Sequence, residues 1–120
     1  EELRRRFQER GSRGLSRTVE RVREYIDHHY MEELTLERLA EEVALSESHL
    51  SRLFKKEVGE TVVAYVTRRR IEVARQLLAE GSLSVKEVSG RSGFADASYF
   101  SRVFTRHEGI SPSDYRRGLL

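Results

Sequence analysis

The sequence predicts an all-α fold in which one helical unit occurs twice. Apolar residues recur at spacings of three and four along the chain, and no stretch alternates as a strand requires. One proline and eight glycines leave long stretches without a helix breaker. The repeat lies in residues 50–59, LSRLFKKEVG, and 100–109, FSRVFTRHEG, which share Ser51/Ser101, Arg52/Arg102, Phe54/Phe104 and Gly59/Gly109.

The similarity continues on both sides of these segments. Downstream, Tyr65 aligns with Tyr115 at the same offset of 50, and upstream, residues 35–45 align with 84–94 at an offset of 49. Two copies of one unit indicate two equivalent surfaces, and two equivalent surfaces suggest a partner that is itself periodic.

Three helices are predicted before residue 60. The first covers 17–30, with apolar residues at helical spacing. The second follows Thr35, which is suited to cap its N-terminus. The third carries Leu50, Leu53 and Phe54, and Gly59 suits the left-handed residue that ends a helix.

The fourth helix is the longest, at about 61–80, with Thr61 as its cap and Gly81 at its end. Its predicted buried stripe consists of Val63, Val66, Ile71, Ala74 and Leu78. At roughly 1.5 Å per residue, such a helix is about 30 Å long, close to the ~34 Å between successive major-groove faces of B-DNA.

The second copy follows the same order of elements. Ser84 and Glu87 form a capping-box pattern that opens the fifth helix, and Asp96 can cap the sixth. The buried face of the sixth helix is predicted to be Phe100, Val103 and Phe104. Pro112 occupies the first position of a short seventh helix through Arg117.

Composition excludes several classes of protein. The chain has no cysteine, no apolar run near the ~20 residues of a membrane span, and no signal-peptide pattern. No catalytic triad, paired carboxylate or phosphate loop stands out, and His28 and His29 are adjacent and cannot share one helix face. We therefore expect no enzyme activity, no cofactor, no metal and no membrane partner.

Helix, tight turn, helix is the pattern within each copy. The turns are residues 44–46 and 93–95, in which Ala44 and Gly93 allow close approach and Leu45 and Phe94 can plug the space beneath. A helix-turn-helix presents its second helix to the DNA major groove. The second helix of each copy has a predicted outward face. The residues of this face are Ser48, Ser51, Arg52, Lys55 and Lys56 in the first copy and Ala97, Ser98, Ser101, Arg102, Thr105 and Arg106 in the second.

The runs LAEEVALSESHLSRLFKKEVG, RRRIEVARQLL and GFADASYFSRVFTRHEGISPSDYRR resemble the DNA-binding domain of the AraC/XylS family of bacterial transcription regulators. The resemblance covers roughly 17–118. It implies seven helices, with helix-turn-helix units at about 35–58 and 84–108 joined by the linker helix at about 61–80. It also implies binding of double-stranded promoter DNA in adjacent major grooves, by a cytoplasmic, nucleoid-associated activator.

By the same resemblance, the base-contacting residues are Ser48, Ser51, Arg52, Ala97, Ser98, Ser101 and Arg102. Phosphate contacts are expected from His49, Lys55, Lys56, Thr105 and Arg106. The short side chains of Ser48 and Ala97 depart from relatives with larger ones, so base contacts there are expected to be few or water-mediated. Contact with RNA polymerase is also implied, as is dimerisation through a domain that this chain lacks.

The basic residues also have alternative roles that do not involve DNA. Arg52 and Arg102 could be solvated and paired with acids such as Glu47 or Asp96, and basic residues at a helix C-terminus also suit the helix dipole. One of Arg68, Arg69 and Arg70 could touch DNA or an acidic partner, or all could be solvated.

The chain as a whole allows two further choices. It could be a helical protein-interaction module that binds through its acidic 37–47 face or its terminal helix, since its net charge is only +2. Residues 1–16 are expected to be a linker or the remnant of an upstream domain. The start at Glu1 rather than Met favours a piece of a longer protein.

Overall fold

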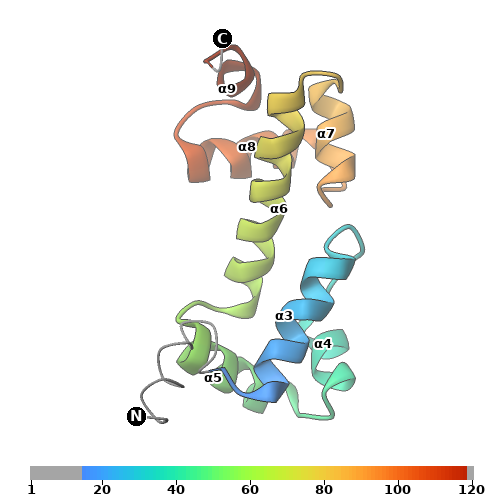
Figure 1. The fold of residues 1–120 in the computed structure, drawn as a ribbon, viewed down its shortest axis with the longest axis vertical. Coiled ribbons are helices and arrows are strands. Elements are labelled where there is room, and N and C mark those ends of the chain that lie inside the picture. Colours follow the sequence, from blue (N-terminus) through green and yellow to red (C-terminus); the bar gives the residue numbers. More distant parts are fainter. Residues whose placement is uncertain (1–14, 119–120) are drawn as a thin grey trace, which may run out of the picture. The chain divides into compact units, whose positions relative to one another are not determined.

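The computed structural model describes residues 15–118, so the linker predicted for 1–16 lies almost wholly outside the described residues. Within this range the chain forms seven helices and no strand (Figure 1). This confirms the all-α fold class. The helices are α3 (Arg17–His29), α4 (Leu36–Glu42), α5 (Glu47–Val58), α6 (Val62–Glu80), α7 (Val85–Arg91), α8 (Ala97–Glu108) and α9 (Pro112–Gly118).

The helices belong to two compact units, each with its own core. The first unit contains α3, α4, α5 and the start of α6, as far as Val66. The second contains Tyr30–Glu33 and everything described from Thr67 onward. None of the helices in residues 15–118 combines the length and apolar composition needed to cross a membrane.

In the first unit, α4 and α5 contact each other and both contact α3, as Figure 1 shows. Burial of one face from each helix holds the unit together, because removal of apolar surface from water is the main favourable contribution to folding. The rings of Phe54 and Tyr65 meet edge to face at 5.6 Å and 71°. The core consists of Val19, Val22, Ile26, Leu39, Ala40, Leu50, Phe54, Val62, Tyr65 and Val66.

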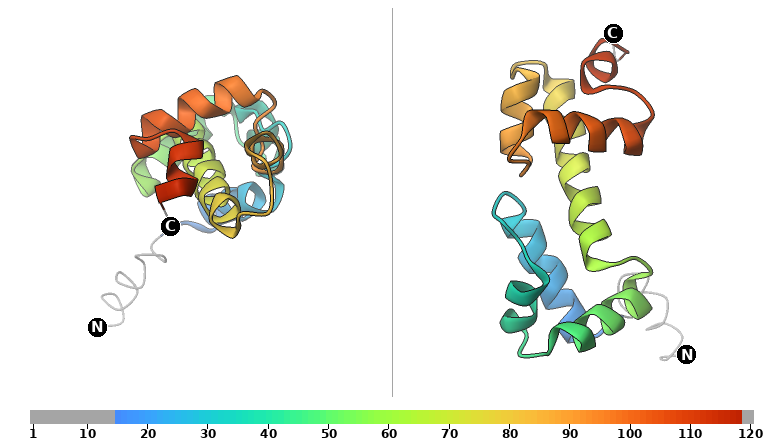
Figure 2. Two further views of the ribbon diagram at one scale, coloured as in Figure 1. Left: turned by 90° about the horizontal axis from the view of Figure 1, so that it is seen from above. Right: turned by 180° about the vertical axis from the view of Figure 1, so that it is seen from behind.

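In the second unit, α8 contacts both α7 and α9, and it crosses the C-terminal half of α6 in the view from behind in Figure 2. The rings of Phe104 and Tyr115 meet edge to face at 5.5 Å and 73°. This pair lies 50 residues after Phe54 and Tyr65 and has nearly the same geometry, so the repeat extends into the core. The core consists of Ile71, Ala74, Leu78, Val88, Phe94, Phe100, Val103 and Phe104.

Both tight turns end their first helix with the same pair of hydrogen bonds. In the first unit, the Leu45 N–H donates to the Ala40 carbonyl at 3.0 Å and the Ala44 N–H donates to the Glu41 carbonyl at 3.2 Å. The equivalent bonds in the second unit are also 3.0 and 3.2 Å long. This is a Schellman ending, which needs a left-handed residue. Ala44 supplies it with φ +56°, and Gly93 with φ +99°.

Gly93 is also required by a close approach of the chain. A Cβ atom at this position would lie 2.4 Å from the Tyr30 carbonyl oxygen and 2.8 Å from Arg70 Nε. Arg70 holds the 30–33 segment in place, since Nε donates to the Tyr30 carbonyl and Nη2 to the Glu32 carbonyl, each at 2.8 Å. Burial lowers the pKa of this guanidinium from its usual value. The turn and this segment therefore pack together only because residue 93 has no side chain.

The predicted helix caps are confirmed. The side chains of Thr35, Thr61 and Asp96 accept hydrogen bonds from the first turns of α4, α6 and α8. Ser84 and Glu87 form the reciprocal capping box.

One core assignment was wrong. Val63 is 71% exposed, whereas its neighbour Val62 is buried. Tyr65, at 2% exposure, packs on Phe54 and fixes which face of α6 turns inward. Residues 62, 65 and 66 then share the inner face by helical spacing, and residue 63 falls outside it.

Candidate nucleic-acid interface

Helix α5 presents a polar face on the side opposite its core residues. Ser46 caps the helix by accepting from the His49 N–H at 3.1 Å, and Leu50 and Phe54 are buried. Because a helix repeats every 3.6 residues, this orientation sends the intervening side chains outward. All six predicted DNA-contacting residues of this helix are exposed: Ser48, His49, Ser51, Arg52, Lys55 and Lys56.

Helix α8 is oriented in the same way by the burial of Phe100, Val103 and Phe104. Ser98, Arg102, Thr105 and Arg106 are exposed, and Ala97 and Ser101 are half-buried. The Thr105 hydroxyl donates to the Ser101 carbonyl at 2.7 Å, so its single donor must leave this carbonyl before the hydroxyl can donate to a phosphate oxygen. A surface hollow of about 440 Å³ is lined by Ser101, Arg102, Thr105 and Arg106.

The two arginines at the repeated position have different surroundings. Neither forms an ion pair with any described residue, so the alternative that Glu47 or Asp96 neutralises them does not hold in this structure. Arg52 has no hydrogen bond or ring contact within the described chain. The Arg102 guanidinium lies 5.8 Å from the centroid of the Tyr99 ring. Both guanidinium groups keep their hydrogen-bond donors available to a partner.

The predicted phosphate-contacting residues lie toward the C-terminal ends of their helices. Lys55 and Lys56 occupy the last turn of α5, and Arg106 that of α8. These positions also suit the helix dipole, so placement alone does not decide between a structural role and phosphate contact. Their side chains have no hydrogen bond or ion pair among residues 15–118, which leaves them available for phosphate.

The basic run on α6 is engaged within the chain. Arg68 pairs with Glu72 at 2.9 Å, Arg69 pairs with the same carboxylate, and Arg70 holds the 30–33 segment. Burial raises the pKa of Glu72, but hydrogen bonds and charge from the two arginines outweigh it, and the pKa is lowered. The role of one of these arginines in contacting DNA stays a prediction.

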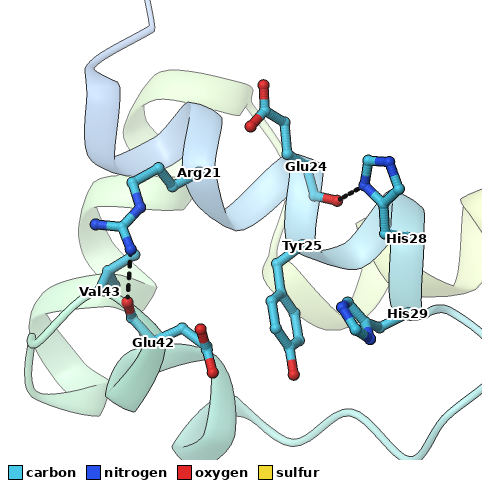
Figure 3. Close-up of a pocket in the computed structure, with 7 residues that line it drawn as sticks. All are labelled: Arg21, Glu24, Tyr25, His28, His29, Glu42 and Val43. Atoms are coloured by element: carbon cyan, nitrogen blue, oxygen red, sulfur yellow. Dashed lines mark hydrogen bonds between the residues drawn. The ribbon is translucent and has the colours of Figure 1, made fainter.

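A second hollow, of about 270 Å³, lies between α3 and α4 (Figure 3). Tyr25 and His29 stack in it at 4.1 Å, His28 Nδ1 lies 2.8 Å from the Glu24 carbonyl, and Arg21 donates to the Glu42 carbonyl at 3.2 Å. Within the described part of the chain, no group of three or more metal-binding side chains gathers. Of these three contacts, two lie within α3 and one joins α3 to α4.

Tyr99 was missed by the sequence analysis. It lies on α8, is 51% exposed, and its ring is the one that approaches Arg102. The repeat could have found it, because the offset of 50 places Tyr99 opposite His49, a residue already assigned to the interface.

Comparisons with known proteins agree with this arrangement. A family model described as a helix-turn-helix domain matches residues 39–118. The chain is 41% identical over 98 residues to the uncharacterized HTH-type transcriptional regulator YijO of Escherichia coli, covering 82% of this chain and 35% of that protein. It is 35% identical over 92 residues to the xylose operon regulatory protein of E. coli, covering 77% of this chain and 24% of that one. The chain thus spans about a third or less of these relatives.

Solved structures share the fold as well. The C-terminal domain of AraT, a response regulator from Geobacillus stearothermophilus, matches with a TM-score of 0.84 and 39% identity, covering 87% of both chains. The DNA-binding domain of AdpA, a global transcriptional factor solved in complex with a target DNA, matches with a TM-score of 0.82 and 29% identity, covering 86% of this chain and 93% of that one.

Proposed function

Because the chain belongs to the AraC/XylS family of bacterial helix-turn-helix transcription regulators, we propose that α5 and α8 are its two recognition helices and that each reads base pairs in a major groove of promoter DNA. The family and fold are those of DNA-binding transcription regulators and not of enzymes. The chain is therefore a DNA-binding domain of such a regulator.

The repeated arginine is the observation that carries this proposal. Arg52 and Arg102 occupy one register of two helices that are oriented by the same core positions, and both side chains are exposed. Arginine can make two hydrogen bonds to the O6 and N7 atoms of guanine. A structural arginine would instead be expected to have a partner within its own unit, as Arg70 does.

Roles on the two helices divide by position. Ser48, Ser51 and Arg52 contact bases from α5, and Ala97, Ser98, Ser101 and Arg102 do so from α8. His49, Lys55, Lys56, Thr105 and Arg106 contact phosphates, which fix the register of the protein on the duplex but carry no sequence information. Only the serine and the arginine recur between the two faces, so the two half-sites differ and the operator is not palindromic.

The proposal also covers the bounds of the domain, its partners and its place in the cell. The domain comprises residues 17–118, and residues 1–16 are a linker or the remnant of an upstream domain. The two helices enter adjacent major grooves, and another surface contacts RNA polymerase. The protein acts in the bacterial cytoplasm, at the nucleoid, as an activator.

Selection from random duplex DNA tests the function directly. We expect one enriched, non-palindromic motif, and footprinting should show two protected major grooves about one helical turn apart. An absence of any enriched motif would contradict DNA reading and favour a protein-interaction module.

Arginine variants test the assigned residues. Arg52→Ala and Arg102→Ala should each weaken binding to the selected site by about 1–3 kcal/mol, and binding to random DNA by less. Arg91→Ala removes an exposed arginine at the end of α7, outside both recognition helices, and serves as the matched control. Equal losses on both DNAs would contradict base reading. Lys56→Ala should weaken binding to all sequences alike and reduce the slope of log K against log salt by about 1.

A further inference from the structure

The position of one exposed aromatic residue on α8 is not explained by packing alone. Tyr99 lies in the first turn of this helix with half of its surface open to solvent, on the face that carries Arg102. The two residues are three apart, and residues at this spacing are neighbours on a helix surface. The ring therefore lies where it can contact the guanidinium as well as the core.

The Tyr99 ring is itself supported by a ring of the core. Its centroid lies 6.3 Å from that of Phe94, with the two rings tilted by 55°. Phe94 is the buried plug of the tight turn, and its ring lies 5.1 Å from the ring of Phe100 in the core. A ring held by the core in this way offers a fixed support for a long, flexible side chain. The supported side chain is Arg102, whose guanidinium carbon lies 5.8 Å from the ring centroid.

We propose that Tyr99 is a positioning residue for base reading: its ring holds the Arg102 guanidinium in place before DNA arrives, so that α8 discriminates bases more sharply than α5. This inference rests on the proposed function. A cation within about 6 Å of an aromatic centroid is attracted by the negative face of the ring. Because the donors of arginine lie in the plane of its guanidinium, contact with a ring face leaves them available for hydrogen bonds. A side chain ordered in advance loses less entropy on binding.

The first unit provides the internal comparison. His49 occupies the position equivalent to Tyr99, and Arg52 has no ring contact among the residues that the structure describes. Arg52 must therefore be ordered by the DNA itself. The two helices have the same scaffold and the same arginine, but only one arginine is positioned in the free protein.

The order of the two arginine side chains can be measured without DNA. We expect ¹⁵N relaxation to show that Arg102 Nε is more ordered than Arg52 Nε in the free protein. Tyr99→Leu should bring Arg102 down to the level of Arg52, and Tyr99→Phe should leave it ordered because the ring remains. Equal mobility of Arg52 and Arg102 in the unmodified protein would overturn the inference, whatever the DNA measurements show.

Binding measurements then test the consequence for affinity. Tyr99→Leu should weaken binding to the selected site by roughly two- to five-fold, the range expected for an exposed cation–π contact. In an Arg102→Ala background the same change should have almost no effect, because Arg102 is the guanidinium that lies over the ring. Tyr99→Phe should bind as the unmodified chain does. The matched change His49→Leu should act independently of Arg52→Ala.

Two results distinguish failure of this inference from failure of the proposed function. If Tyr99→Leu weakens binding by the same factor with and without Arg102, the ring acts on DNA by itself and the positioning role is refuted while DNA reading stands. If no DNA motif is selected, the proposed function fails, and the relaxation measurement alone decides whether Tyr99 orders Arg102. Thermal unfolding of each variant checks that the second unit, which contains α8, is folded.

Discussion

Replacement of Gly93 by alanine should destabilise the second unit much more than the same replacement at Gly109. Both glycines follow a helix and have positive φ, +99° at Gly93 and +84° at Gly109. The space around them differs. A Cβ at Gly109 would meet nothing within 4 Å, whereas one at Gly93 would lie 2.4 Å from the Tyr30 carbonyl oxygen. The pair of variants therefore separates backbone strain from a collision.

The expected magnitudes follow from these two terms. A left-handed conformation costs an L-residue about 1–2 kcal/mol, and part of this is offset by the lower chain entropy of unfolded alanine. Gly109→Ala should thus cost about 1 kcal/mol. At Gly93 the Tyr30 carbonyl must also retreat, which breaks the hydrogen bond from Arg70 Nε. A hydrogen bond to a charged group contributes about 1.5–3 kcal/mol, so Gly93→Ala should cost about 3 kcal/mol in total.

Urea denaturation followed by far-ultraviolet circular dichroism measures both changes, from the midpoint and slope of each transition. Arg70→Met supplies an independent check, because it removes the guanidinium from the same contact. Gly93→Ala in that background should cost less than in the unmodified chain, since one hydrogen bond is already lost. If Gly93→Ala is no more destabilising than Gly109→Ala, the close approach of Tyr30 does not constrain residue 93, and the reasoning is refuted.

Three further predictions concern other positions. Ala44→Gly should stabilise the first unit by about 0.5–1 kcal/mol, because glycine adopts the left-handed conformation at the turn without strain; an unchanged urea midpoint would contradict this. Val62→Ala should cost about 1.5 kcal/mol in unfolding free energy, but Val63→Ala less than about 0.5 kcal/mol, because only the first side chain is buried. The N–H of Ser84 donates to the Glu87 carboxylate and lowers its pKa. Since a lowered folded-state pKa stabilises above the unfolded value, this contribution should be present at neutral pH and be lost as pH falls through the folded-state pKa; an NMR titration of the carboxyl carbon, with Glu87→Gln as the control, measures it.

Local signals in the sequence determined most of the fold. A cap such as Thr35 or Asp96 acts within its own helical turn, so four consecutive residues suffice to place a helix start. Gly59 has a similarly local effect, because it adopts the left-handed conformation that ends α5. These features were predicted because the forces behind them act over a few residues.

Features that depend on distant partners were not predicted. Val63 was placed in the core because adjacent valines fit a helical stripe almost equally well, and only the contact of Tyr65 with Phe54 decides between them. The contact of Arg70 with the Tyr30 carbonyl joins residues 40 apart, and the sequence carries no mark of it. The need for glycine at position 93 was attributed to helix approach alone, without the carbonyl that enforces it.

For the candidate site, the sequence could predict which side chains are exposed but not their surroundings. Exposure of Arg52 and Arg102 followed from the helical period once the buried face was known. Whether Arg52 and Arg102 form ion pairs with nearby acids depends on side-chain geometry, which cannot be derived from the sequence. Tyr99 was assigned to neither the core nor the interface, because its contact with Arg102 depends on side-chain geometry.

The residues of α5 that pack in the core are different from those proposed to read bases, and this separation affects how mutations can change such a protein. Among the described residues, the side chains of Ser48, Ser51, Arg52, Lys55 and Lys56 make no hydrogen bond, ion pair or ring contact. Substitutions there cost the folded state little. Under the proposed function, mutations at these positions can therefore change the DNA sequence that α5 prefers while the protein stays folded. On α8, by contrast, the Tyr99 ring lies against both Phe94 in the core and Arg102, so a substitution of Tyr99 affects both faces of this helix.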